Sequence, residues 1–293
     1  MPYSATQRLT ATVTASHRPA LPNFSRRAAI SIQTVKTNPC LIRYCYALWL
    51  TLVFIGSLYW QPAMAAPQPT NFTAKYDVSK GIMAVGSTVR TLRDKGNGHF
   101  VFESVTEPGG IARLFTSGKV VERSHWEWQN SKMVPHEYIY VNSSDQKRDV
   151  KLIFDWDSYE VINIINGDPW TMELETDTLD KLIYQLAIMY DLNQGNNELL
   201  YRVADGGTMK TYDMTIEGEE RLVMELGTFH TVKVVRNTKN REIVMWCARE
   251  LQFLPVKIQQ RRPDDSTVTA KLVEISGIAL PGKSTDKTNQ AEK

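Results

Sequence analysis

The feature that most constrains the fold of this chain is a two-residue alternation of apolar and polar side chains. It runs from residue 71 to residue 165 and again from residue 198 to residue 278. Such alternation is typical of strands with one buried and one solvated face. Turn signals such as Gly96-Asn97-Gly98 and Gly206-Gly207 separate the runs every ~8 to 14 residues. The sequence therefore predicts a succession of antiparallel strands.

One segment has a different period. Within residues 177–192, apolar side chains recur with the spacing of one helical face: Leu179, Leu182, Ile183, Leu186 and Tyr190. Asp177 is the expected N-cap, with Asp180 three residues later, and Gly195 is a natural stop. The pattern predicts a helix over residues 177–192.

Residues 66–279 contain no convincing linker and no repeat of fixed period, so they are predicted to form one β-rich domain. Because a flat sheet of so many strands would be unusual, the sheet is expected to curl. The predicted fold is mainly β: one large curved antiparallel sheet, a half-barrel or barrel-like meander, with a single docked α-helix. Residues 280–293 are polar and are predicted to be a disordered tail.

Residues 1–65 have the composition of a leader, with six basic and no acidic residues. The apolar stretch from Tyr44 to Trp60 is shorter than the roughly 20 residues of a membrane-spanning helix. Arg43 precedes it and Ala63-Met64-Ala65 follows, which predicts a secretory signal cleaved between Ala65 and Ala66. The protein is therefore expected in the periplasm, with no stable membrane span after cleavage. An uncleaved anchor is the alternative.

The first ~34 residues, rich in Ser, Thr, Ala and Arg, are interpreted as an over-long N-terminus, although their composition also suits a transit peptide.

The charge and cysteine content of the chain after residue 65 differ from those of the whole chain. The whole chain has 34 basic and 32 acidic residues, so removing six basic residues leaves 28 against 32, a net charge of −4. A mildly acidic domain argues against nucleic acid as a partner. Of the three cysteines, only Cys247 lies after residue 65, in an apolar run where a buried, inert thiol is expected.

Motifs that carry chemistry are missing or weak. There is no G-x-S-x-G, no phosphate-binding loop and no strand-linked G-x-G-x-x-G. The acidic residues Asp155, Asp157 and Glu160 are interpreted as an exposed turn. No catalytic residue is predicted.

The histidines after residue 65 have no metal-ligand spacing: His99, His125, His136 and His230. His125 and Glu127 share a strand face and His136 follows soon after, which makes them the best metal candidates. They remain poor ones, so neither a metal site nor a cofactor is predicted.

Aromatic residues offer a better candidate surface. Trp126 and Trp128 share one strand face, as do Tyr138 and Tyr140 on the next predicted strand. Paired across a hairpin, these four residues would form a stripe suited to a sugar ring or an apolar ligand. The alternative is that they fill the core, because aromatic cross-strand pairs are ordinary stabilisers of sheets.

Four segments in order resemble motifs of a bacterial exported family, the domain of unknown function 3108 (DUF3108). They are YDVSKGIMAVG (76–86), TDTLDKLIYQL (176–186), EERLVMELGTFHTVKV (219–234) and WCARELQFLPVKI (246–258). Asp180 stands where this family commonly has Ser. The resemblance implies an exported, largely β protein of the Gram-negative envelope with no established activity. It implies no catalytic residues.

Together these features predict a non-enzymatic periplasmic binding or envelope-maintenance protein. Its concave apolar or aromatic surface would take a lipid-like ligand or a segment of an envelope protein. Two alternatives remain open. One is a glycan-active enzyme with paired carboxylates beside the aromatic stripe, and the other is a scaffold that pairs through a sheet edge.

Overall fold

The computed structural model describes residues 69–114, 118–145 and 149–280, which all belong to one compact unit. The predicted leader, its cleavage site and the predicted tail beyond Leu280 lie outside the described residues. The predictions made for them stay predictions.

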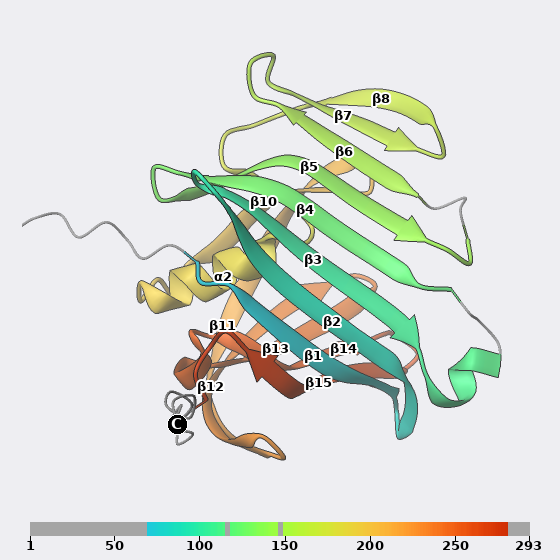
Figure 1. Ribbon diagram of the computed structural model, residues 1–293, viewed down its shortest axis with the longest axis vertical. Helices are drawn as coiled ribbons and strands as arrows, with labels where there is room; N and C mark the ends of the chain where they lie inside the picture. Colours follow the sequence, from blue (N-terminus) through green and yellow to red (C-terminus); the bar gives the residue numbers. More distant parts are fainter. Residues whose placement is uncertain (1–68, 115–117, 146–148, 281–293) are drawn as a thin grey trace, which may run out of the picture. The chain divides into compact units, whose positions relative to one another are not determined.

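One sheet of fifteen strands accounts for most of the described chain, so the prediction of a mainly β fold is confirmed (Figure 1). The first eight strands are β1 (Phe72–Lys80), β2 (Met83–Gly96), β3 (His99–Pro108), β4 (Val120–Gln129), β5 (Lys132–Asn142), β6 (Val150–Asp155), β7 (Glu160–Ile165) and β8 (Asp168–Glu173). The others are β9 (Thr178–Asp180), β10 (Leu199–Asp205), β11 (Thr208–Met224), β12 (Gly227–Thr238), β13 (Arg241–Ala248), β14 (Leu254–Arg261) and β15 (Thr267–Ser276). Short 3-10 helices are η1 (Gly110–Leu114) and η3 (Arg249–Leu251).

The strand order is nearly that of a simple meander. It runs β8-β7-β6-β5-β4-β3-β2-β1-β15-β14-β13-β12-β11-β10-β9, so the first and last long strands, β1 and β15, pair in the middle. All pairings are antiparallel except that of β9 with β10, which is parallel. The predicted antiparallel sheet is therefore correct apart from this last strand.

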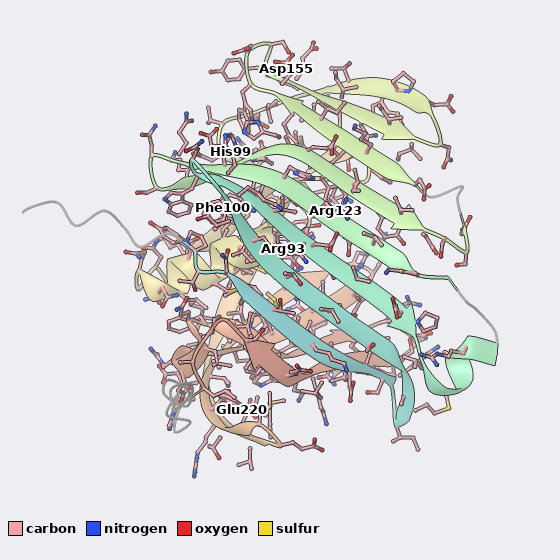
Figure 2. All side chains as sticks on the ribbon, viewed as in Figure 1. Arg93, His99, Phe100, Arg123, Asp155 and Glu220 are labelled. Carbon is pink, nitrogen blue, oxygen red and sulfur yellow. The ribbon has the colours of Figure 1, made fainter. Side chains whose placement is uncertain are left out.

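The alternation read from the sequence matches the two faces of the sheet. In β1, Phe72, Ala74 and Tyr76 are buried and the residues between them are more exposed. The opposite face carries ion pairs, such as Arg123 and Arg93 with Glu103 (Figure 2). This is the expected pattern for antiparallel strands with one face in the core and one in water.

Register shifts bend the sheet and bring its two halves, β1–β8 and β9–β15, together. One lies in the β4–β5 pairing between His125 and Trp126, and others interrupt the pairings of β1, β11 and β13. Such bulges increase the local twist. As a result, Ser124 of β4 donates a hydrogen bond to Asp180 of β9, although these strands lie far apart in the strand order. The expected curling is confirmed.

The described helix α2 (Tyr184–Asn193) is shorter than predicted. Residues 177–183 were wrongly assigned to it, because Thr178–Asp180 form β9 and pair with Arg202–Ala204 of β10. The expected N-cap, Asp177, has positive φ (61°) and lies before that strand. The helix ends as predicted, with Gly195 (φ 78°) just after the C-cap Gln194. No described helix has the length and apolarity needed to cross a membrane.

Helix α2 lies against both halves of the curled sheet (Figure 1). Arg90 of β2 donates to Gln185 at 2.6 Å, and Tyr184 packs edge-on against Tyr212 of β11 with ring centroids 4.9 Å apart. Six of its ten residues are buried: Tyr184, Leu186, Ala187, Ile188, Met189 and Leu192. A helix buried around most of its circumference is part of the core rather than a surface layer.

The core itself is filled with large side chains. The largest fully buried ones are Trp126, Tyr76, Tyr138, Phe100, Phe102 and Phe229. Cys247 is buried among them, and burial raises the pKa of its thiol to about 12. The expectation of a buried thiol is confirmed, and at neutral pH the thiol stays protonated and unreactive.

Candidate ligand-binding site

The start of helix α2 is held by a buried carboxylate. Asp180 is completely buried, and its Oδ1 accepts the backbone N–H groups of Leu182 (2.7 Å) and Ile183 (3.0 Å). Its Oδ2 accepts the hydroxyl of Ser124 on β4. Burial raises the pKa of Asp180 to about 6 in spite of these hydrogen bonds, which lower it. Asp180 therefore ties the helix to the opposite half of the sheet.

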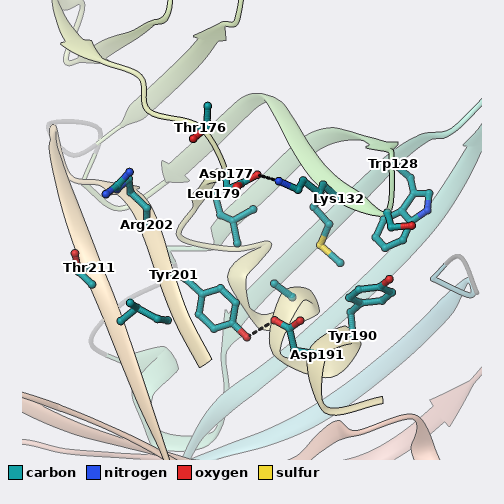
Figure 3. A pocket seen from close by; sticks show the side chains of 14 residues that line it. Trp128, Lys132, Thr176, Asp177, Leu179, Tyr190, Asp191, Tyr201, Arg202 and Thr211 are labelled. Carbon is teal, nitrogen blue, oxygen red and sulfur yellow. Dashed lines mark hydrogen bonds and ion pairs between the residues drawn. The ribbon is translucent and has the colours of Figure 1, made fainter. Parts of the chain in front are cut away.

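Beside this joint lies a groove of about 440 Å³, which we call the helix groove (Figure 3). Its lining comes from the β4–β5 hairpin, the segment around β9, helix α2 and strands β10 and β11. The lining residues are Trp128, Ser131, Lys132, Met133, Thr176, Asp177, Leu179, Ala187, Tyr190, Asp191, Leu200, Tyr201, Arg202 and Thr211. The groove thus follows the line where the two halves of the sheet meet.

Aromatic and aliphatic side chains form much of the lining. Trp128 and Met133 are directly opposite each other on β4 and β5. The Trp128 ring packs edge-on against Tyr190 of α2, with centroids 4.9 Å apart. Leu200 of β10 is 64% exposed, which leaves an aliphatic side chain in contact with water along the groove. Surfaces of this kind bind apolar groups of ligands.

The charged groups of the helix groove are paired with protein partners. Lys132 donates to Asp177 at 2.7 Å (Figure 3). Arg202 forms an ion pair with Glu175. Asp191 accepts hydrogen bonds from Tyr201 (2.8 Å) and Asn196 (3.0 Å). Burial, followed by the charge of Asp191, raises the pKa of Tyr201, so its phenol stays protonated as the donor. Both cationic side chains of the groove therefore have an acidic partner, whereas Asp191 has only neutral hydrogen-bond donors.

A second groove of about 300 Å³ lies along another side of α2 and also uses Tyr190. Its lining residues are Pro69, Thr70, Phe72, Leu92, Leu186, Met189, Tyr190, Asn193, Gln194 and Gln252. Tyr190 is only partly buried, so its ring is a wall common to both grooves. A change in its rotamer would alter the size of both.

The four aromatic residues predicted to bind a ligand are not gathered into one stripe. Trp126 and Tyr138 are both 1% exposed and belong to the core. Trp128 lines the helix groove, whereas Tyr140 lines a separate surface depression and has the Lys181 ammonium 4.8 Å from its ring centroid.

The register of the β4–β5 hairpin explains this separation. Tyr138 faces Ser124 and Tyr140 faces Glu122, so neither tyrosine is opposite a tryptophan. The register shift between His125 and Trp126 cannot be read from the alternation of residues. Tyr190 and Tyr201 do line the groove. The sequence pattern indicates only a helix position for Tyr190 and a strand position for Tyr201.

The acidic residues 155, 157 and 160 form the expected turn. Asp155 accepts the backbone N–H groups of Asp157 (3.0 Å) and Ser158 (3.1 Å), and these hydrogen bonds lower the pKa of its carboxyl. None of these acidic residues lines the helix groove. The cluster is a local turn motif of the β6–β7 hairpin.

A family model described as "Protein of unknown function (DUF3108)" matches residues 72–273. The chain belongs to this family. The resemblance drawn from the four motifs is thereby confirmed, and every residue that lines the helix groove lies within the part of the chain matched to DUF3108.

Two solved structures are similar to this DUF3108 protein. One is a β-barrel-like protein of the domain of unknown function DUF1849 from Brucella abortus, with a TM-score of 0.49 and 9% identity over 71% of this chain and 98% of that chain. The other is a hypothetical protein from Chlamydia trachomatis, with a TM-score of 0.27 and 10% identity over 76% of this chain and 94% of that chain. The search of curated proteins found no match.

Proposed function

We propose that this DUF3108 protein is a non-enzymatic binding protein of the bacterial envelope, and that the helix groove holds a single-chain amphipathic lipid. The observation that carries the proposal is the groove of about 440 Å³ with Trp128, Met133, Leu179 and Tyr190 in its lining. Its volume lies within the range of ~300–1,000 Å³ typical of small-molecule sites.

The paired charges of the groove support a ligand without net charge. Lys132 and Arg202 already have the acidic partners Asp177 and Glu175, so an anionic headgroup would have to compete with these ion pairs. A zwitterionic or uncharged headgroup would not have to compete with them. The hydrocarbon chain would lie against the aromatic and aliphatic lining, where burial contributes roughly 25 cal/mol per Å².

The envelope is proposed from the leader. Residues 44–60 and Ala63-Met64-Ala65 have the features of a cleavable export signal, and a periplasmic protein has access to lipids in transit between membranes. Cell fractionation and mass determination of the N-terminus test this part. The expected first residue is Ala66, and a cytoplasmic protein with an intact leader contradicts it.

The sheet edge gives less support to a strand-pairing scaffold. The free edge strand β8 is short, begins with Asp168-Pro169 and ends with Glu173. Proline and charged residues are the usual means of protecting an edge from further pairing. The other terminal strand, β9, is buried over its whole length.

The lipid proposal is tested with the full chain, expressed with its own leader, and a fluorescent single-chain phosphocholine lipid. Saturable binding is expected. Leu200→Ser removes exposed aliphatic surface and should weaken binding about tenfold, the loss expected for part of one buried side chain. Ala187→Phe places a ring in the groove and should abolish binding.

Val223→Ser is the matched control, because Val223 is also an exposed aliphatic strand residue (76%) but lines a different depression. Its affinity should equal that of the unmodified protein. Equal affinity of all three variants, or no saturable binding by the unmodified protein, rejects the proposal. Extraction and mass spectrometry of co-purified lipid provide an independent check.

A further inference from the structure

On the outer face of the sheet, away from the helix groove, three potential metal ligands meet. One ligand atom from each of His99, Glu127 and His136 lies within 4.8 Å of the others. These residues come from β3, β4 and β5, and none of them lines either groove beside α2. Figure 2 shows His99 at the start of β3.

Strand register brings the three side chains together. His99 is directly opposite Glu127 in the β3–β4 pairing, so their side chains project from the same face. Between β4 and β5, Trp126 pairs with Pro135 and His125 with Glu137, which leaves His136 as the extra residue of a bulge. Bulges re-aim side chains, and His136 Nε2 lies 3.4 Å from Glu127 Oε2.

The hairpin that precedes His99 is itself fixed. The Gly98 carbonyl accepts the backbone N–H of Trp128 at 2.7 Å, and Gly98 has φ of 80°. A Cβ on Gly98 would lie 3.2 Å from the Trp128 carbonyl oxygen, so glycine suits both the conformation and the close approach. This turn positions His99 beside β4, with its ring centroid 6.3 Å from that of His136.

We propose that His99, Glu127 and His136 form a binding site for a divalent transition-metal ion, best suited to Zn²⁺. Two imidazoles and one carboxylate are a common zinc ligand set, in which water or another molecule occupies the fourth position. With bonds of ~2.1 Å, tetrahedral geometry separates neighbouring ligand atoms by about 3.4 Å. The distance between His136 and Glu127 already has this value, and His99 needs only a small side-chain movement.

An ion pair between His136 and Glu127 alone would not require His99. The presence of a second imidazole on the third strand, rather than an additional carboxylate, favours zinc, copper or nickel over calcium or magnesium, which prefer oxygen ligands. The side chains of His136 and Glu127 are 44% and 28% exposed, so an ion from solvent can reach them.

The test is calorimetric titration of the full chain, without a histidine tag, with ZnCl₂ in a buffer that does not bind zinc. One strong site is expected. His99→Ala, His136→Ala and Glu127→Gln should each weaken zinc binding at least tenfold, since each removes one of three protein ligands. Saturating zinc should raise the thermal midpoint of the unmodified protein and not that of these variants.

His125→Ala is the matched control, because His125 lies on the same face of β4, two residues before Glu127, and does not belong to the cluster. Its zinc affinity should be unchanged. Equal losses in His125→Ala and His99→Ala overturn the proposal, as does an unmodified protein that binds zinc no more tightly than the His99→Ala/His136→Ala double variant. Circular dichroism of each variant confirms that the fold is intact.

Discussion

Asp180 and Asn163 are both completely buried polar residues close to the two ends of the sheet, but their surroundings differ. Asp180, at the β9 end, accepts three hydrogen bonds, from Ser124 and from the backbone of Leu182 and Ile183. Asn163 of β7, next to the β8 end, has no partner for either side-chain polar atom. Hydrogen bonds to a buried carboxylate hold the β9 end in place. The β8 end is instead held by packing around an amide that has no hydrogen-bond partner.

The packing at the β8 end depends on one glycine. Trp170 of β8 lies against Gly207, in the turn between β10 and β11, and its indole N–H is 3.4 Å from the Gly207 carbonyl oxygen. A Cβ on Gly207 would approach the Trp170 ring to 2.2 Å and the Asn163 amide nitrogen to 2.9 Å. The curled sheet is therefore held together in two places, near β9 by directional hydrogen bonds and near β8 by the fit of Trp170 against Gly207.

Replacing the buried carboxylate should have the largest effect. Asp180→Ala leaves Ser124 and two backbone N–H groups without their acceptor, so it should lower the free energy of unfolding by about 4 kcal/mol. Urea denaturation measures this. Asp168→Ala, an exposed position at the start of β8, is the control and should change stability by less than ~0.5 kcal/mol. Similar losses in the two variants would show that the hydrogen bonds of Asp180 contribute no more to the free energy of unfolding than an exposed side chain does.

The pH dependence of stability tests the same joint without removing it. The pKa of Asp180 is raised from 3.8 to about 6. Between these two pH values the folded protein therefore keeps a proton on this carboxyl that the unfolded chain has released. The contribution of Asp180 to the free energy of unfolding is therefore fully present below pH ~4 and is lost as the pH rises through about 6. Each pKa unit by which the folded and unfolded states differ corresponds to about 1.4 kcal/mol.

Asp180→Asn should remove this contribution, since the amide does not titrate. The difference in unfolding free energy between the unmodified protein and Asp180→Asn should fall by about 2 kcal/mol from pH 4 to pH 7. A difference that is constant with pH, or that rises, contradicts a raised pKa.

The β8 end is tested by Gly207→Ala, which should cost about 2 kcal/mol, because the residue has φ of 77° and the new methyl group meets Trp170. In a Trp170→Ala background the clash with the indole ring is relieved, so the cost of Gly207→Ala should fall to ~1 kcal/mol, which comes from the backbone conformation and the remaining close contact with Asn163. Strictly additive losses in this double-mutant cycle would mean that the two residues do not contact each other.

The smallest expected effect is a gain. Asn163→Leu replaces a buried amide that has no hydrogen-bond partner by an apolar side chain of similar size, so it should stabilise the protein by about 1 kcal/mol. Chemical denaturation at neutral pH is sufficient to detect it. The same type of change at the satisfied site, Asp180→Leu, should destabilise the protein strongly and serves as the contrast. A loss in Asn163→Leu would mean that the amide is hydrogen-bonded in solution.

Much of the fold was accessible from the sequence because it depends on local periodicity. Alternation of buried and exposed residues predicted the long strands, such as Phe72–Lys80, and the helical face of Leu186 and Tyr190 predicted the helix. The burial of Cys247 followed from its apolar neighbours. Each of these patterns is repeated over many residues, so a single exception does not hide it.

The candidate sites depended on pairings that only the tertiary structure decides. Residues 178–180 became a strand rather than a helical turn because β10 offers them a parallel partner more than twenty positions away in sequence. The bulge at Trp126 set which aromatic residue faces the groove and brought His136 to Glu127 and His99. The sequence by itself determined strands, helix and family, since these follow from local patterns, whereas the grooves and the histidine cluster required long-range register, which no local pattern encodes.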